Sequence, residues 1–134
     1  MPGWTTVEEI IAYQLSVKLR DQIVAMVDSG DMGKDFDFRD QIKDAARSAP
    51  RNISEGFYRY KHGEFAYHVN VAKASLGEVK THLVDARTSR YITEKQFTKL
   101  YPLAKEAMAT TSGLLKHLRS SEAPKVWLKP PAHS

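Results

Sequence analysis

Apolar side chains recur along this chain every three or four residues, and this spacing predicts helices rather than strands. No segment of strand length alternates apolar and polar residues between hairpin turns. Four stretches carry the helical spacing, separated by short polar connections. We expect helices over about 5–28, 37–59, 62–88 and 94–119.

Capping residues and prolines mark the ends of these predicted helices. Thr5-x-x-Glu8 and Thr6-x-x-Glu9 both fit a capping box at the start of the first helix, and Thr93-x-x-Gln96 fits one at the start of the fourth. Pro50 lies inside the second stretch and lacks the N–H that a helix interior uses. The apolar spacing continues past it, so we expect one kinked helix there.

The short connections determine the expected architecture. Helices that follow one another through short loops pack antiparallel. The prediction is therefore an all-α fold, an antiparallel up-down-up-down four-helix bundle over residues 1–119. Residues 120–134 hold three of the six prolines and are expected to form an irregular C-terminal tail.

Composition narrows the classes of function. The chain has 134 residues, 42% of them hydrophobic, which is enough for one buried core. It has no cysteine, which excludes disulfides, cysteine zinc sites, iron–sulfur clusters and thiol nucleophiles. No apolar run approaches the roughly 18 residues of a membrane span, and the first residues do not resemble a signal peptide. We expect a cytoplasmic protein with no membrane partner.

Basic residues form a row on the second predicted helix. Four of them recur every fourth residue and therefore lie on neighbouring turns, and two more follow beyond the helix. These six candidate nucleic-acid contacts are Arg39, Lys43, Arg47, Arg51, Arg59 and Lys61. Such a row could bind phosphates, with nearby aromatic residues available for stacking on bases. The alternative is a solvated face that pairs with Asp40, Asp44 and the acidic first helix.

Catalytic and metal-binding patterns are not found. There is no phosphate-binding glycine loop and no activated nucleophile. Glu64 and His68, and Glu78 and His82, stand four residues apart, but no Glu-x-x-His motif of a di-metal bundle occurs. We interpret both as surface pairs and expect no metal, no cofactor and no enzyme. A di-metal enzyme is a third class, which metal in the purified protein would reveal.

A small polar group interrupts the second helix. Glycine inside a helix costs about 1 kcal/mol relative to alanine, so Gly56 requires a packing or turn reason. Asn52 and Glu55 lie one turn apart beside an apolar residue. We expect a buried polar network that sets the helix register, and the alternative is a catalytic carboxylate at Glu55.

The same residues carry a family resemblance. Residues 41–59, 64–65 and 71–79 are similar to a bacterial four-helix-bundle family first described from reading frames in intervening sequences of 23S rRNA genes, often labelled "S23 ribosomal protein". The accessory variability determinant of diversity-generating retroelements belongs to it. The match is most specific at a set of positions that includes Pro50, Asn52, Glu55, Gly56, Ser75 and Glu78.

This resemblance implies a non-enzymatic homopentamer with a basic surface proposed to contact nucleic acid. In the retroelement branch, the pentamer works with a reverse transcriptase and its template RNA. The family usually has Arg at Asp44, an apolar residue at Arg47 and a small residue at Arg51. These differences imply that the basic surface is displaced in this chain.

Two functions follow from these observations. The first is a homo-oligomer that binds RNA or DNA through its basic surface. The alternative is a protein–protein interaction scaffold that uses the acidic first helix or the tail residues Trp127 and Leu128. Aromatic residues off the apolar stripes favour subunit contacts; they are Tyr13, Phe36, Tyr67, Tyr91 and Tyr101.

Overall fold

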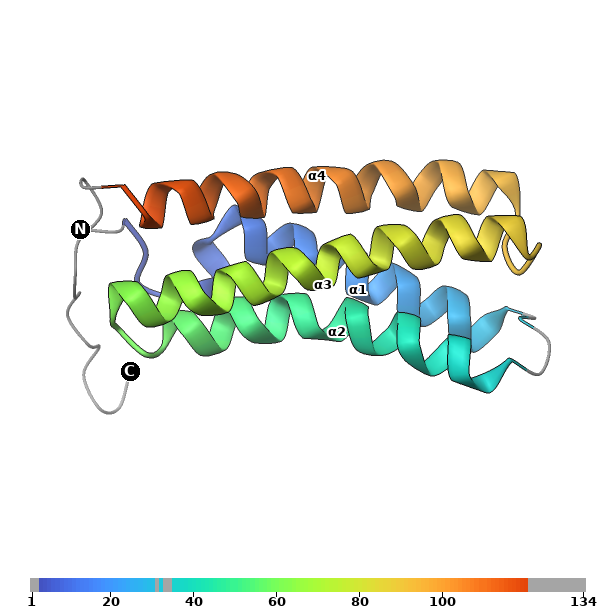
Figure 1. Cartoon of the computed structure of the whole chain (residues 1–134), viewed down its shortest axis with the longest axis horizontal. Helices are drawn as coiled ribbons and strands as arrows, with labels where there is room; N and C mark the ends of the chain where they lie inside the picture. Colours follow the sequence, from blue (N-terminus) through green and yellow to red (C-terminus); the bar gives the residue numbers. More distant parts are fainter. Residues whose placement is uncertain (1–2, 31, 33–34, 121–134) are drawn as a thin grey trace.

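Four helices make up most of the protein (Figure 1). The structure is a computed structural model that describes residues 3–30, 32 and 35–120. The helices are α1 Ile11–Ser29, α2 Phe36–Phe57, α3 His62–Thr88 and α4 Glu94–Leu118, and the short 3-10 helix η1 Val7–Glu9 precedes them. The described residues contain no strand, so the predicted all-α fold is confirmed. The predicted tail lies outside the described residues from 121 onward, with Trp127 and Leu128.

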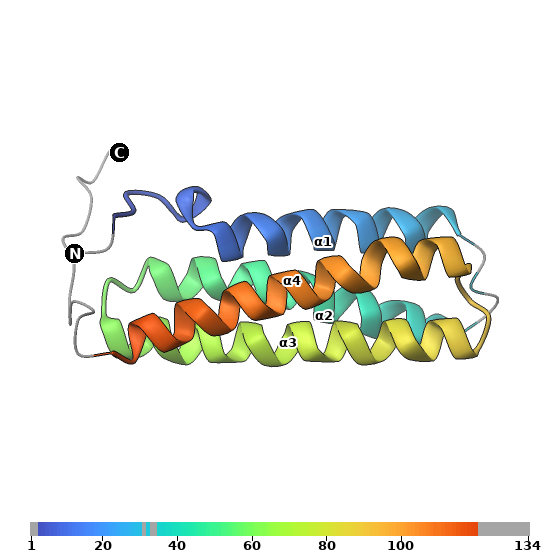
Figure 2. The same cartoon turned by 90° about the horizontal axis from the view of Figure 1, so that it is seen from above.

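The helices pack as a closed ring. Consecutive helices run in opposite directions, as the sequence colouring of Figures 1 and 2 shows. Helix α1 packs against α2 and α4, and α3 packs against α2 and α4. Within the described part of the chain, the diagonal pairs α1–α3 and α2–α4 make no close backbone approach. This is the up-down-up-down arrangement that short connections favour.

The apolar stripes of all four helices meet inside this ring. Leu19, Ile42 and Leu76 are among the residues with no exposed surface, and each such side chain contributes about 1.5–3 kcal/mol relative to an exposed position. Phe57 and Phe65 pack edge to face, with ring centroids 5.8 Å apart. They lie on either side of the connection from α2 to α3, so an aromatic contact closes that end of the core.

The first helix begins later than predicted, at Ile11 rather than near residue 5. The Glu9 carboxylate does accept a hydrogen bond from the backbone N–H of Thr6, at 2.9 Å. However, this interaction closes the 3-10 turn η1 and not the α-helix. Ile10 is extended between the two helices, and both Ile10 and Val7 are buried. The break therefore lets two apolar side chains reach the core.

The other helix ends agree closely with the sequence. Asp35 caps α2 by accepting a hydrogen bond from the N–H of Phe38 at 3.1 Å. Helix α2 continues through Pro50 without interruption, as the apolar spacing predicted. At the start of α4, Thr93 and Gln96 form the predicted capping box.

The connection from α3 to α4 contains a backbone conformation that favours glycine. Arg90 has φ of 59°, and the N–H of Tyr91 bonds the carbonyl of Ala86 at 2.8 Å, as in a Schellman motif. Because a side chain strains this conformation, Arg90→Gly should raise the free energy of unfolding by about 1 kcal/mol in denaturant titrations. Arg90→Ala keeps the strain and should give no gain. Equal effects of the two changes would contradict this account.

Candidate nucleic-acid interface

The structure divides the six predicted nucleic-acid contacts into paired and unpaired bases. Lys43 of α2 donates to Asp28 near the end of α1, with 2.8 Å between Nζ and Oδ1. Arg39 lies over the ring of Phe36, 5.5 Å from its centroid. For Lys43, pairing with the acidic first helix is therefore the observed arrangement.

This ion pair affects the carboxylate of Asp28. The hydrogen bond from Lys43 lowers the pKa of Asp28, and the positive charges of Lys43, Arg47 and Arg39 lower it further. A lowered folded-state pKa contributes stability above the ordinary value of about 3.9. That contribution is lost as pH falls through the lowered folded-state pKa.

Lys43→Met should therefore raise the pKa of Asp28 and reduce the part of the acid dependence of stability that this carboxylate supplies. The measurement is an NMR titration of the Asp28 carboxyl carbon in both proteins. Lys18→Met, which removes an exposed lysine elsewhere on α1, is the control and should leave Asp28 unchanged. An Asp28 titration that is the same with and without Lys43 would refute the pairing.

Arg59 and Lys61 lie near the far end of α2 and are also paired. Arg59 contacts Glu55 at 3.1 Å and Glu64 at 3.6 Å. Lys61 lies 3.9 Å from Glu64. Carboxylates therefore neutralise these two bases. Glu55 itself is exposed and pairs with Arg59, so it does not form part of a buried network.

Arg47 and Arg51 are the members of the row that make neither an ion pair nor a contact with an aromatic ring among the described residues. Both are exposed, and neither forms a hydrogen bond or ion pair with any residue that the structure describes. They line a groove of about 630 Å³ between α1 and α2, together with Arg20, Tyr13 and Glu55, whose carboxylate pairs with Arg59. This α1–α2 groove therefore presents two free guanidinium groups one helical turn apart.

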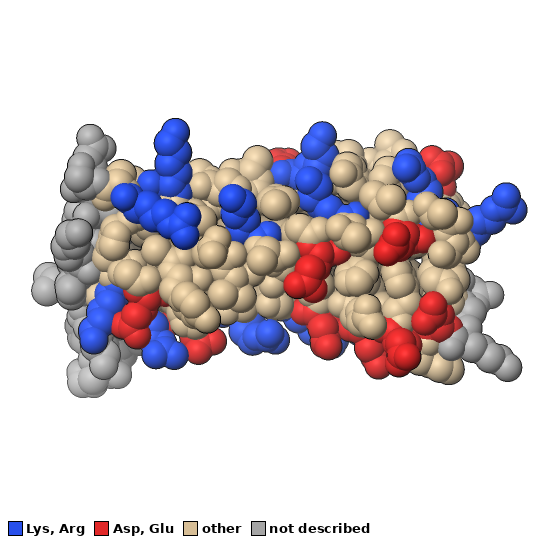
Figure 3. Space-filling model, in the orientation of Figure 1, with Lys and Arg blue, Asp and Glu red and all other residues tan. Residues whose placement is uncertain are grey.

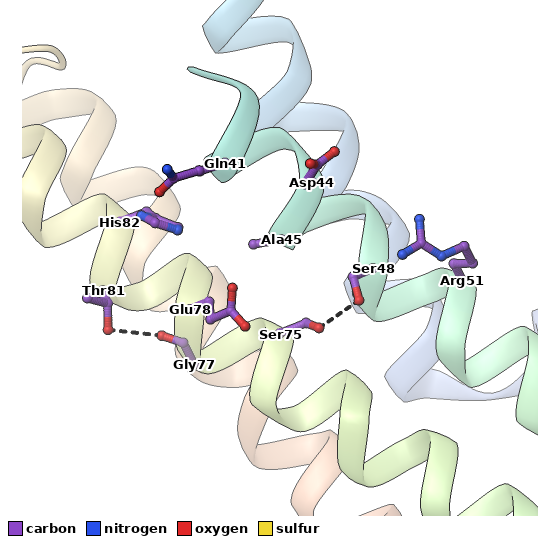
Figure 4. Close-up of a pocket in the computed structure, with 10 residues that line it drawn as sticks. All are labelled: Gln41, Asp44, Ala45, Ser48, Arg51, Ser75, Gly77, Glu78, Thr81 and His82. Carbon is purple, nitrogen blue, oxygen red and sulfur yellow. Dashed lines mark hydrogen bonds between the residues drawn. The ribbon is translucent and has the colours of Figure 1, made fainter. Parts of the chain in front are cut away.

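A polar network around Asn52 is present, and it joins α2 to α3. Asn52 donates to the carbonyl of Ser48 at 2.9 Å, and its Oδ1 lies 3.2 Å from Nδ1 of His68. The hydroxyls of Ser48 and Ser75 are 2.7 Å apart and point toward each other across the helices (Figure 4). Glu55 lies outside this network, which corrects that part of the prediction.

Gly56 brings the same two helices close together. The residue is buried, and a Cβ atom built on it would lie 2.5 Å from Cβ of His68. Glycine is therefore needed for the close approach of α2 and α3. This close packing explains why a glycine lies inside the helix.

A second groove, between α2 and α3, has mixed charge. Its volume is about 1000 Å³, and Asp44, Glu78 and Arg51 are among the residues around it (Figure 4). The ring of His82 packs edge to face on the ring of Phe38, with ring centroids 5.7 Å apart. The two carboxylates oppose phosphate binding in this groove. Among the described residues, no three His, Asp or Glu side chains gather to hold a metal ion.

The aromatic residues off the apolar stripes divide into two groups. Phe36 and Tyr67 are 61% and 65% exposed. Tyr13, Tyr91 and Tyr101 are half-buried against the core, and the Tyr91 hydroxyl donates to Asp35 at 2.8 Å. Only Phe36 and Tyr67 of the five thus keep the exposure that a subunit contact requires.

The net positive charge lies mainly in the second half of the chain. Residues 1–61 contain nine bases and ten acids, whereas residues 62–134 contain eleven bases and six acids. In Figure 3, Lys and Arg line the upper edge, over α4 and the adjoining part of α3, whereas many Asp and Glu gather toward α2. The stretch that carries the row on α2 is also basic, because residues 39–61 contain six bases and three acids, but the acidic residues 1–38 offset that charge.

Comparisons with known proteins agree with this architecture. Residues 8–113 match the family described as 23S rRNA-intervening sequence protein. A crystal structure of a protein of unknown function from the S23 ribosomal protein family of Bacteroides thetaiotaomicron has the same fold, with a TM-score of 0.71 and 18% identity. The similarity covers 79% of this chain and 96% of that one. No curated protein matches the chain. None of the described helices is long and apolar enough to cross a membrane.

Proposed function

We propose that this chain, which belongs to the 23S rRNA-intervening sequence protein family, is a homo-oligomer that binds nucleic acid without catalysing a reaction. RNA is the first nucleic acid to test, because the family description associates these proteins with ribosomal RNA genes.

The observation that carries this proposal is the pair of unpaired bases in the α1–α2 groove. Arg47 and Arg51 stand one turn apart, and Arg20 lines the same groove from α1. A guanidinium group presents donors that match a phosphate, so neighbouring arginines suit successive phosphates of a backbone. Arg20 itself pairs with its neighbour Asp21, at 3.0 Å, and no other ion pair of Arg20 occurs among the described residues.

The test is fluorescence anisotropy of labelled RNA and DNA with Arg47→Gln and Arg51→Gln combined. Each lost phosphate contact should reduce the slope of log affinity against log salt by about 0.7–0.9. We therefore expect the double variant to bind more weakly, with a slope about 1.5 shallower. Arg59→Gln combined with Lys61→Gln removes the same charge from paired bases and serves as the control. Equal losses in both variants would show that Arg47 and Arg51 are not contacts.

The oligomeric part of the proposal is a homopentamer, which rests on the family resemblance. Exposed Phe36 and Tyr67 support self-association, because aromatic residues are enriched at interfaces. Native mass spectrometry should find a species of about five times 15.2 kDa. Five copies would make a modest charge multivalent and raise avidity. If only a monomer is found, the proposed homopentamer is wrong.

Two further parts of the proposal rest on the sequence alone. A reverse transcriptase is a candidate partner by analogy with the retroelement branch, and we place the protein in the cytoplasm. A gene for a reverse transcriptase beside the gene for this chain would support the first part.

A protein–protein interaction scaffold is the second candidate function. It is favoured by Phe36, Tyr67 and Ile11, whose large apolar side chains are more than half exposed. If the wild-type protein binds no nucleic acid at low salt, this candidate becomes the preferred one.

A further inference from the structure

A set of basic residues follows the junction of α3 and α4. Lys73, Lys80 and Arg87 recur every seventh residue of α3, and this spacing returns to nearly the same side of a helix. Lys105 and Arg119 stand fourteen residues apart on the α4 side. We refer to these five residues as the α3–α4 face.

Contacts with aromatic rings show that the α3 row lies beside α4. The guanidinium of Arg87 lies 3.9 Å from the ring centroid of Phe97, and Nζ of Lys80 lies 5.8 Å from that of Tyr101. The two rings stack on each other, with centroids 4.9 Å apart. Lys105 follows Tyr101 by one turn and therefore lies on the same side of α4. Cation–π contacts of this kind hold the two bases in position.

No carboxylate in the described part of the chain neutralises this face. None of its five bases forms an ion pair with a residue in the described ranges. The carboxylate of Glu78 lines the groove toward α2, and Asp85 follows it by seven residues on the same side. By contrast, Lys43, Arg59 and Lys61 on and just beyond α2 all contact carboxylates within 4 Å.

The dimensions of the face suit an extended polyanion. Lys73 and Arg87 are fourteen residues apart, which is about 21 Å along a helix. The three bases of α3 are thus spaced at about 10 Å, and Lys105 and Arg119 add a second line beside them. A small anion would contact only one base at a time, whereas a nucleic-acid backbone carries phosphates along the whole length.

We propose that the α3–α4 face is the principal surface on which this chain binds the phosphodiester backbone of nucleic acid. The inference rests on the proposed function, and it assigns Arg47 and Arg51 to a smaller, accessory contact. Contacts of lysine and arginine with phosphates carry no sequence information. Binding at this face should therefore depend strongly on salt and weakly on sequence.

The test compares three variants of the full-length protein by anisotropy with a labelled RNA of mixed sequence, in single- and double-stranded form. The first combines Lys73→Gln, Lys80→Gln and Lys105→Gln, and the second combines Lys43→Gln, Arg59→Gln and Lys61→Gln. Both remove three positive charges, but the second removes them from paired bases. The third combines Arg47→Gln and Arg51→Gln. Circular dichroism confirms that each variant folds.

We expect the first variant to lose at least about tenfold in affinity near 100 mM salt, with a salt slope about 2 shallower. The paired-base variant should stay within about threefold of wild type. Equal losses in these two variants would overturn the inference, because net charge alone would then explain binding. Loss only in the Arg47 and Arg51 variant would also overturn it but leave the proposed function in place. Absence of wild-type binding would overturn both.

Discussion

Gly56→Ala should destabilise the bundle by about 2 kcal/mol. The new Cβ would lie 2.5 Å from Cβ of His68 and 3.2 Å from a ring carbon of Phe65. Overpacking of this kind costs about 1–3 kcal/mol, and this contact belongs at the upper end because it forces α2 and α3 apart. Alanine favours a helix over glycine by about 1 kcal/mol, which offsets part of that cost. Denaturant titration of both proteins measures the difference in their free energies of unfolding.

Gly113→Ala on α4 is the matched control for this prediction. A Cβ atom there meets no atom within 4 Å, so only helix propensity changes. This variant should be more stable than wild type by up to about 1 kcal/mol. We therefore expect the free energy of unfolding to fall in Gly56→Ala and to rise in Gly113→Ala. A Gly56→Ala protein as stable as Gly113→Ala would show that α2 and α3 do not approach as closely as described.

Asn52→Ala should have the second-largest effect, a loss of about 1.5 kcal/mol. The change removes the donor to the Ser48 carbonyl at 2.9 Å and the acceptor that lies 3.2 Å from Nδ1 of His68. Leaving polar groups without partners costs about 1–3 kcal/mol when they are buried. This site is half-buried, so the lower part of that range applies. Thermal or denaturant unfolding provides the value.

Asn70→Ala on α3 controls for the intrinsic preference of alanine for helices. Asn70 is exposed and has no hydrogen-bond partner among the described residues. The change should be neutral or slightly stabilising. If both asparagine variants changed stability equally, the network between α2 and α3 would contribute nothing measurable.

The fold was largely predictable because its determinants are local. Apolar spacing and short connections identified four helices and their order, and Thr93 and Gln96 identified the start of α4. The same logic failed at the beginning of the chain, where a capping box at Thr6 and Glu9 closes a 3-10 turn. A capping pattern does not distinguish the two kinds of helix, and the burial of Ile10 decides between them through contacts distant in sequence.

The candidate interface was only partly predictable because charge pairing is a tertiary property. The row on α2 looked uniform in the sequence, yet Asp28 of α1 neutralises Lys43, and Glu64 of α3 contacts Arg59. Arg47 lacks such a partner. The α3–α4 face was missed because its residues recur every seven positions and come from two helices. The excess of bases after residue 61 was the available signal.

The most direct test of nucleic-acid binding is the salt dependence of wild-type affinity for RNA. Anisotropy of labelled RNA should be measured between about 50 and 200 mM salt, the range in which release of counterions dominates. This account predicts a linear decrease of log affinity with log salt, with a slope of about −3 or steeper, corresponding to at least four phosphate contacts. No binding at 50 mM salt, or an affinity that does not change with salt, would contradict it.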